Sequence, residues 1–412
     1  MDIARLISDR ARSVDASGIR RVVELGKKMP DKIDLSIGQP DFDVPAAIKK
    51  AACDAINSVP DGKSNRNGYT ANPGLDALQV AIARRLEAEL GWHVRAPGMN
   101  ADSPTGMFIT TGTASALALA YLAVLGPGDE IIIPDPYFTI YPEMAKVCHA
   151  KAVACDTYPD FRLTAARVAP LITPRTKMVL LNSPGNPSGA VMTSAECDDL
   201  LALCRGRGIL LISDEIYDEF TFSESRTEPP ANPSSLVGLT PGTLLCPSPA
   251  RRARAEEDVL LIRGFGKTYG ITGWRLGYAV GPMALIEQMV KLQQHTIVCA
   301  PTPLQWGAVA ALETDMRSTV AHYEQRRNRV YERLSRVAEV SKPGGAYYAF
   351  PRIPPKLGLT AQQFADKLVE RKVLVIPGNV FSTRDTHIRI SFAVRDDILD
   401  RGIDEICRAM GG

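Results

Sequence analysis

The stretch RGFGKTYGITGWRLGY, Arg263 to Tyr278, decides how this sequence is interpreted. It contains the letters GKT, with which a nucleotide-binding P-loop ends. A P-loop also needs a glycine five positions before the glycine that precedes the lysine, and Leu261 occupies that position. The dinucleotide-binding pattern G-x-G-x-x-G fails as well, because its last glycine position holds Tyr269. Lys267 therefore needs another explanation.

The composition limits the class of protein. The chain has 412 residues, 45% of them hydrophobic, which is enough for roughly two or three domains of about 150 residues each. Its 48 basic and 46 acidic residues give a net charge of +2, so we expect neither nucleic acid nor a membrane as a partner. The longest apolar stretch, 116–126, is shorter than the ~18 residues of a membrane span.

The first residues and the cysteines indicate where in the cell the protein is located. The first residues carry a charge every few positions and lack the apolar core of a secretory signal. The eight cysteines are scattered and form neither a CxxC pair nor a group with zinc spacing. We therefore expect a soluble, cytoplasmic protein with free thiols and no metal site.

The middle of the chain alternates short apolar runs with helical patterns such as 194–205. We predict strands at 108–112, 130–135, 152–156, 177–184, 208–215, 258–264 and 276–281. Most of these runs are almost entirely apolar, which is typical of strands buried on both faces of a parallel sheet. The pattern predicts an α/β fold in which helices sandwich a mostly parallel sheet. Ligand-binding groups of such folds lie in loops at the strand ends.

The chain divides into three parts. Residues 46–310 carry the α/β pattern and form the predicted large domain. Residues 311–412 read as a smaller α+β domain, with which residues 1–45 are expected to pack, so that both termini build it. Within the large domain, residues 223–258 are rich in proline, serine and charge, which predicts a long and weakly ordered surface loop.

Chemically distinct side chains follow the predicted strands. They are Thr113, Ala114, Phe138, Asn186, Asp214, Tyr217, Lys267 and Arg275. This set matches the needs of pyridoxal 5'-phosphate (PLP). The cofactor needs a lysine amine for its aldehyde, a carboxylate for its pyridine nitrogen and an aromatic ring against its own. It also needs neutral groups at its 3-hydroxyl, and an arginine and backbone amides at its phosphate.

Nearly the whole chain resembles the class I/II aminotransferases, fold-type I PLP enzymes of the aspartate aminotransferase superfamily. The resemblance lies in motifs that occur in the family's order: LSIGQPDFDVP, GYTANPGLDALQVAIA, FITTGTASAL, PGDEIIIPDPYFTIYPEM, NSPGNPSG, SDEIY, GFGKTYGITGWRLGY, PGGAYYAF and HIRISFA. Any one of them alone is a weak signal, whereas the ordered set is specific.

The resemblance implies a role for each residue around the cofactor ring. Lys267 is the expected Schiff-base lysine, which also moves the proton of the substrate's α-carbon. Asp214 is expected to pair with the pyridinium, and Asn186 and Tyr217 to hold the 3-oxygen. Phe138 is expected to stack on the ring.

The same resemblance assigns the phosphate. Arg275 and the backbone amides of Thr113 and Ala114 are expected to bind it. Tyr69 is expected to reach the phosphate of the neighbouring subunit, which implies a homodimer with shared active sites.

At the substrate, the resemblance implies that Arg389 binds the α-carboxylate in a bidentate fork, next to Asn186 and the amide of Gly38. The implied activity is transamination between an L-amino acid and a 2-oxo acid, with glutamate and 2-oxoglutarate as the expected pair. A lyase that uses PLP for β- or γ-elimination remains an alternative, since it needs the same cofactor residues. A DNA-binding regulator of the same fold is disfavoured by the short N-terminal segment and the balanced charge.

The chain departs from the family in three places. Relatives commonly carry serine one and three positions before the lysine, where this chain has Gly266 and Gly264, and Ala114 also lacks a hydroxyl. We expect phosphate binding to rely more on Arg275 for that reason. Asp214 and Lys267 are 53 positions apart, more than the family leads us to expect, because of the segment 223–258.

Ala114 also bears on the substrate. One subgroup of aspartate-preferring relatives carries a lysine at this place, where it faces the side-chain carboxylate. Without that cation a buried carboxylate would be unpaired, which costs several kcal/mol. We therefore expect neutral or aromatic amino acids to be favoured over aspartate, with a broad-range aspartate aminotransferase as the alternative. Arg20 or Arg21 is a candidate cation for glutamate.

Overall fold

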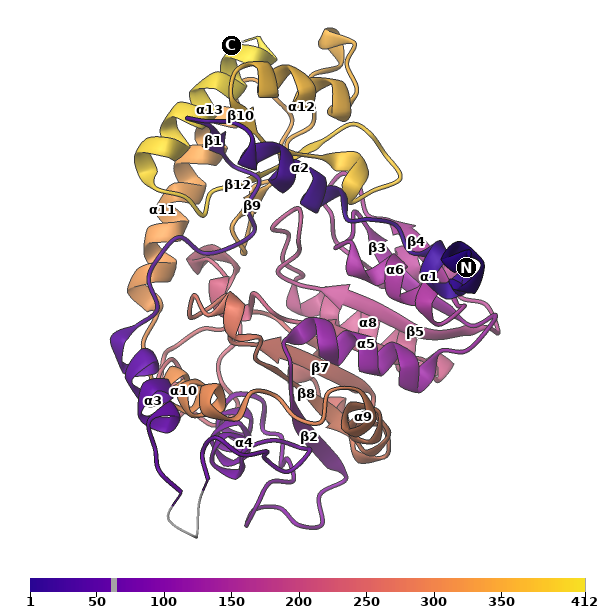
Figure 1. The fold of residues 1–412 in the computed structure, drawn as a ribbon, viewed down its shortest axis with the longest axis vertical. Helices are drawn as coiled ribbons and strands as arrows, with labels where there is room; N and C mark the ends of the chain where they lie inside the picture. The colour runs from indigo at the N-terminus through magenta and orange to yellow at the C-terminus, as the bar shows by residue number, and fades with distance from the viewer. Residues whose placement is uncertain (61–64, 412) are drawn as a thin grey trace.

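A computed structural model describes residues 1–60 and 65–411 and has a seven-stranded sheet at its centre (Figure 1). The strands follow the order β2-β8-β7-β6-β5-β3-β4. Their bounds are β2 Thr105–Thr110, β3 Glu130–Asp135, β4 Lys151–Asp156, β5 Thr176–Asn182, β6 Leu210–Asp214, β7 Val259–Gly264 and β8 Gly277–Pro282. The pairs β4–β3, β3–β5, β5–β6 and β6–β7 are parallel, and β8 is antiparallel to both of its neighbours. The α/β fold with a mostly parallel sheet is confirmed.

All seven predicted strands are present, with ends that differ by a few residues. Their apolar character has the expected cause, because successive side chains enter cores on opposite faces of the sheet. On β3, Ile132 packs into one core, and Ile131 and Ile133 pack into the other. The exception is β4, an edge strand in which Cys155 is the buried residue.

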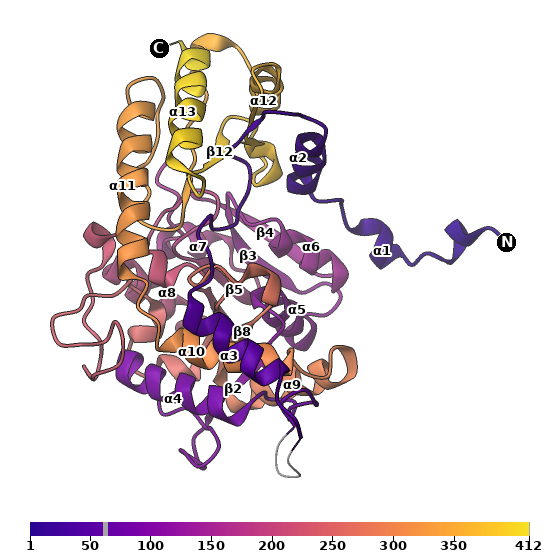
Figure 2. The same cartoon turned by 60° about the vertical axis from the view of Figure 1, so that its left-hand side comes forward.

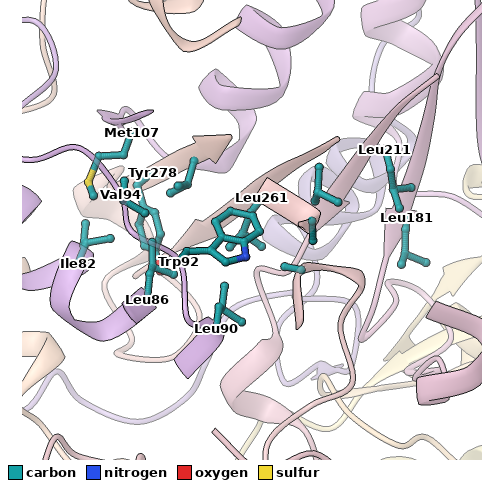
Figure 3. Close-up of a cluster of buried hydrophobic side chains, with 14 of the residues drawn as sticks. Ile82, Leu86, Leu90, Trp92, Val94, Met107, Leu181, Leu211, Leu261 and Tyr278 are labelled. Carbon is teal, nitrogen blue, oxygen red and sulfur yellow. The ribbon is translucent and has the colours of Figure 1, made fainter. Parts of the chain in front are cut away.

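Helices cover both faces of the sheet. One core contains side chains from α3 Ala46–Ile56, α4 Asp76–Leu90, α7 Ala165–Val168, α8 Ser194–Arg207 and α10 Thr302–Leu312. Figure 3 shows part of it around Trp92, where side chains that follow α4 meet those of the strands. The opposite core contains α5 Thr113–Val124, α6 Ile140–Val147 and α9 Met283–Thr296.

The remaining elements form a separate apolar core above the large sheet (Figures 1 and 2). Its strands are β1 Ile33–Asp34 with β10 Val373–Leu374, and β11 Ile376–Pro377, β12 Ile388–Ser391 and β9 Tyr348–Ala349. The helices around it are α2 Gly18–Lys27, α11 Arg317–Leu334, α12 Ala361–Glu370 and α13 Asp396–Met410. The pairing of β1 with β10 joins the first part of the chain to the last. The division at 45 and 310 stays a prediction. The short helix α1 Asp9–Ser13 lies on an arm that extends away from the body (Figure 2).

The segment 223–258 is exposed over much of 229–244 and buried over 245–250, and its weak order stays a prediction. Leu239, Ala250 and Ala255 are fully buried. Arg251 and Arg252 form ion pairs with buried acids. Composition alone does not reveal these buried partners, because it counts charges without their contacts.

Membrane-spanning helices and clustered metal ligands are both absent from the described residues. No helix among residues 1–60 and 65–411 is long and apolar enough to cross a membrane. Over the same residues, no group of three or more His, Cys, Asp or Glu side chains is placed to hold a metal ion.

Candidate active site

Strand register brings the predicted residues to one edge of the sheet. Asp214 is the last residue of β6, where it pairs with Ile262 of β7 and with Asn182 of β5. Lys267 follows the end of β7, and Asn186 follows the end of β5. Because parallel strands end at the same edge of a sheet, residues far apart in the sequence meet there.

The carboxylate of Asp214 is buried and half satisfied. Its Oδ2 accepts a hydrogen bond of 2.8 Å from the Tyr141 hydroxyl, and its Oδ1 has no hydrogen-bond partner among the described residues. Burial raises the pKa of Asp214 to about 6, although the Tyr141 hydrogen bond and the Ile216 amide oppose this effect. A buried carboxylate oxygen without a partner is costly, so it is suited to receive a cationic donor from a ligand.

The amine of Lys267 lacks an acidic partner within the described residues. Its Nζ donates a hydrogen bond of 2.6 Å to the carbonyl oxygen of Gly38 and lies 5.9 Å from the centre of the Tyr217 ring. Burial lowers the pKa of Lys267 to about 8, with further lowering by Arg389 and Arg275. A lysine with such a pKa is partly neutral near pH 8, and the neutral amine is the form that attacks a carbonyl carbon.

The guanidinium of Arg389 is 1% exposed and bonded to neutral acceptors. Nη1 donates to Oδ1 of Asn186 at 3.1 Å, and Nη2 donates to the carbonyl oxygen of Ser36 at 2.7 Å. Its Nε has no partner in the described part of the chain. The rings of Tyr348 and Phe381 lie 4.5 and 4.7 Å from the guanidinium carbon. A buried cation with neutral partners is a receptor for an anion such as a carboxylate.

The start of α5 forms a cradle with Arg275. A Cβ atom on Gly112 would lie 2.7 Å from Nη2 of Arg275, so the guanidinium packs directly over the residue before the helix. The first amides of a helix bind anions, and here a cation lies beside them. Close approach also explains Gly264, because a Cβ there would lie 2.9 Å from Cγ2 of Thr113. The same Cβ would lie 2.8 Å from Cδ1 of Ile216, so a serine at position 264 would require the side chains of Thr113 and Ile216 to shift.

The family model "Aminotransferase class I and II" matches residues 30–406. The chain belongs to this family. It is 32% identical over 408 residues to a probable N-acetyl-LL-diaminopimelate aminotransferase of Bacillus subtilis, covering 97% of this chain and 95% of the relative. It is 31% identical to aromatic-amino-acid aminotransferase 2 of Thermococcus litoralis, with 97% of each chain covered. The structure of Thermus thermophilus aspartate aminotransferase with maleate superposes with a TM-score of 0.83 at 29% identity, covering 98% and 99% of the two chains.

The pocket of this aminotransferase fits PLP, the cofactor of the family. The partnerless Oδ1 of Asp214 suits a protonated ring nitrogen, and Lys267 offers its amine. The start of α5 with Arg275 suits a phosphate. Among the described residues, the Oδ1 of Asp214 is a buried group without a partner that the bound cofactor would satisfy.

The other predicted residues have mixed placements. Phe138 packs edge-on against Tyr141 at 5.9 Å between ring centres, beside the acid. The Tyr217 hydroxyl shares a hydrogen bond of 3.0 Å with the Tyr348 hydroxyl. Tyr69 is not brought into the pocket of its own chain, because its side chain is 85% exposed. Its predicted role requires a second subunit.

Sequence reasoning missed three residues that shape this pocket. Tyr141 donates to Asp214, and Tyr348 contacts both Tyr217 and Arg389. Asn182 donates to the backbone oxygen of Asp214 at 2.9 Å and accepts from the amide of Asn186 at 2.9 Å. One signal was available for Asn182, a polar residue that ends an apolar strand. The contacts of the two tyrosines join segments remote in sequence.

Proposed function

We propose that this aminotransferase moves the amino group between an L-amino acid and a 2-oxo acid, with glutamate and 2-oxoglutarate as one pair, and favours neutral or aromatic amino acids over aspartate. The observation that carries the first part is Arg389, a buried guanidinium with neutral partners that a substrate α-carboxylate would satisfy. A cytoplasmic location is part of the same proposal.

Each polar group of the pocket has a distinct task. Bound PLP supplies an electron sink for the charge that develops on the substrate's α-carbon. The Nζ of Lys267 takes the α-proton and returns it, for which a pKa of about 8 is well placed. The Oδ1 of Asp214 would accept a hydrogen bond from the ring nitrogen of bound PLP, and Tyr141 fixes the orientation of the carboxylate. Asn186 and Tyr217 would hold the ring oxygen.

Binding and orientation of the substrate rest on Arg389. Its contacts with Asn186 and Ser36 hold the planar guanidinium in place, and the flanking rings of Tyr348 and Phe381 prevent it from rotating. A fixed fork positions the α-carbon because a carboxylate binds it through two parallel hydrogen bonds.

The proposed substrate preference rests on the cations that the pocket offers. Lys267, Arg389 and Arg275 already have tasks, and Ala114 stands where one subgroup of relatives has a lysine. Arg21 lines a cleft of about 440 Å³ together with Tyr137, the neighbour of Phe138. An exposed arginine there can bind the distal carboxylate of glutamate without the cost of burying an unpaired charge. The relatives named above have three different substrates and therefore do not decide the preference.

The test is kcat/KM for aspartate, phenylalanine, leucine and alanine with 2-oxoglutarate as acceptor. We expect phenylalanine or leucine to exceed aspartate. Aspartate leading by about tenfold, or 1.4 kcal/mol of transition-state binding, would overturn the preference. Ala114→Lys should raise kcat/KM for aspartate, whereas the uncharged Ala114→Met should not.

We also propose a homodimer in which Tyr69 completes the partner's phosphate site. Support comes from the exposed position of Tyr69, whose ring has little cover from the described residues of its own chain. Sedimentation should show a dimer, and Tyr69→Phe should weaken PLP binding about tenfold by removing one hydrogen bond to the phosphate, worth about 1.5 kcal/mol. An unchanged PLP dissociation constant would remove Tyr69 from the site.

A further inference from the structure

A largely buried network of charged side chains lies behind Asp214 and Lys267. It contains Arg85, Glu89, Glu215, Asp218, Glu219, Glu228, Arg251, Arg252 and Arg263, and we call it the Glu89–Arg263 network. None of these residues has a role in the chemistry described above. Three of them, Glu228, Arg251 and Arg252, belong to the segment 223–258, whose function the sequence left open.

Arg263 is the centre of the network. Its Nη1 and Nη2 bind the two carboxylate oxygens of Glu89 at 2.9 and 2.8 Å, and Nη2 also binds Oε2 of Glu215 at 2.8 Å. Its Nε lies 3.0 Å from the same Glu215 oxygen and 3.1 Å from Oδ2 of Asp218. One guanidinium therefore joins α4 to the ends of β6 and β7.

These strand ends carry the catalytic groups. Glu215 directly follows Asp214, and its amide bonds to the carbonyl oxygen of Ile262 at 2.9 Å. Arg263 lies in β7, four positions before Lys267. The ion pair between Glu215 and Arg263 thus clamps the two backbones from which the acid and the lysine project.

The segment 223–258 touches two of the three carboxylates that Arg263 holds, those of Glu89 and Glu215. Nη2 of Arg251 binds Oε1 of Glu89 at 2.6 Å, and its Nη1 binds the Glu89 carbonyl oxygen at 2.9 Å. The hydroxyl of Ser248 donates to Oε1 of Glu215. The segment is therefore continuous with the clamp rather than attached to the outside of the domain.

Charge balance makes this contact consequential. The network holds five carboxylates and four guanidinium groups, and the segment supplies two of the four, Arg251 and Arg252. Loss of Arg251 leaves Glu89 with less positive charge near it. Arg263 is then drawn toward Glu89 and away from Glu215, because a buried carboxylate requires compensation.

We propose that the segment 223–258 is a positioning element of the active site. Arg251 and Ser248 hold Glu89 and Glu215 so that Arg263 fixes the ends of β6 and β7, and with them Asp214 and Lys267. The proposal rests on the roles given to Asp214 and Lys267 under the proposed function.

The test compares Arg251→Met, Arg251→Lys and Arg254→Met. Arg254 lies in the same segment but is exposed and pairs with Glu257, so it controls for the loss of an arginine. Arg251→Met should lower kcat about ten- to a hundredfold while KM for the amino donor changes little, since displaced catalytic groups slow the chemical step. Arg251→Lys should restore most of kcat, and Arg254→Met should match the wild type.

Rates are counted per bound PLP, well below the unfolding temperature, so that lost protein does not count as lost catalysis. A normal kcat per bound PLP in Arg251→Met overturns the proposal and leaves the segment a structural role. If Arg251→Met does not fold, Ser248→Ala decides, because it keeps every charge and removes one hydrogen bond to Glu215. A severalfold lower kcat in Ser248→Ala supports the proposal, and a wild-type kcat contradicts it. A wild-type enzyme that transaminates in the same assay separates this outcome from failure of the proposed function.

Discussion

The catalytic pocket and the Glu89–Arg263 network are neighbouring clusters of buried charged side chains that differ in their partners. In the pocket, Asp214, Lys267 and Arg389 bond to hydroxyl, carbonyl and amide groups, and within the described residues none of them forms a salt bridge. In the network, Arg263 binds two or more carboxylates, and Glu89 binds two or more arginines. Paired charges hold the chain together, whereas unpaired ones are available to a cofactor and a substrate.

The pKa values follow the same division. Burial raises the pKa of Asp214 to about 6 and lowers that of Lys267 to about 8, so both groups move toward their neutral forms. Burial acts in the same direction on Glu89, but Arg263 and Arg251 outweigh it and hold the pKa of that carboxylate well below its usual range. The difference is caused by the partners and not by depth.

The largest expected effect is that of Lys267→Ala. The turnover rate of the variant should fall about 10²- to 10⁴-fold or more. The variant lacks both the amine to which PLP attaches and the base that moves the α-proton. It should fold normally, since Lys267 has no salt bridge in the described structure to lose. Activity and thermal unfolding are the measurements.

Two controls belong to this prediction. The exposed Lys291→Ala should behave as the wild type. Borohydride treatment of the wild-type holoenzyme, followed by peptide mapping, should find PLP fixed to Lys267. A label on any other lysine would falsify the assignment.

A matched pair of arginine variants tests the comparison itself. Arg263→Met leaves Glu89 and Glu215 without their shared cation, so it should lower the free energy of unfolding by about 3–5 kcal/mol. Arg389→Met removes a buried cation whose partners are neutral, so the apo form should change by no more than about 1 kcal/mol. Denaturant unfolding of both apo variants measures the difference. Equal losses would show that the two clusters are energetically alike.

The sequence predicted the secondary-structure elements better than it predicted the contacts between residues that are far apart in the chain. Local composition sufficed for the strands of the large sheet, and for all of them but the edge strand β4 the reason is burial on both faces, which leaves a continuous apolar run. The motif residues around Lys267 were found because the family preserves their order. The bond from Tyr141 to Asp214 spans 73 positions and that from Glu89 to Arg263 spans 174, and no local pattern records such a pairing. The buried part of the segment 223–258 was not predicted for the same reason, since its partners lie elsewhere in the chain.

The pH dependence of apo stability separates the two clusters further. The folded pKa of Asp214, about 6, lies above its ordinary value of 3.8, so its contribution to stability is full below pH 4 and lost as the pH rises through 6. Between these values the free energy of unfolding of the apo protein should fall by about 2–3 kcal/mol relative to Asp214→Asn. Lys267 does not interfere, because its folded pKa of about 8 lies below the ordinary pKa of lysine, and its effect on stability falls above this pH window. A constant difference between wild type and Asp214→Asn across this range would contradict the assignment.

The smallest effect expected here concerns the phosphate cradle. Arg275→Ala should raise the PLP dissociation constant about ten- to a hundredfold, because a charge-assisted bond contributes roughly 1.5–3 kcal/mol. Arg275 packs over Gly112, and the chain has glycine at positions 264 and 266, where relatives commonly have serine, so few other side chains can compensate. Fluorescence titration of apo protein with PLP measures the change, with Arg254→Ala as an exposed arginine control. Arg275 forms no salt bridge in the described residues, so apo stability should stay the same; a large loss would move Arg275 from the ligand-binding charges to the structural ones. An unchanged dissociation constant would mean that the amides at the start of α5 hold the phosphate without it.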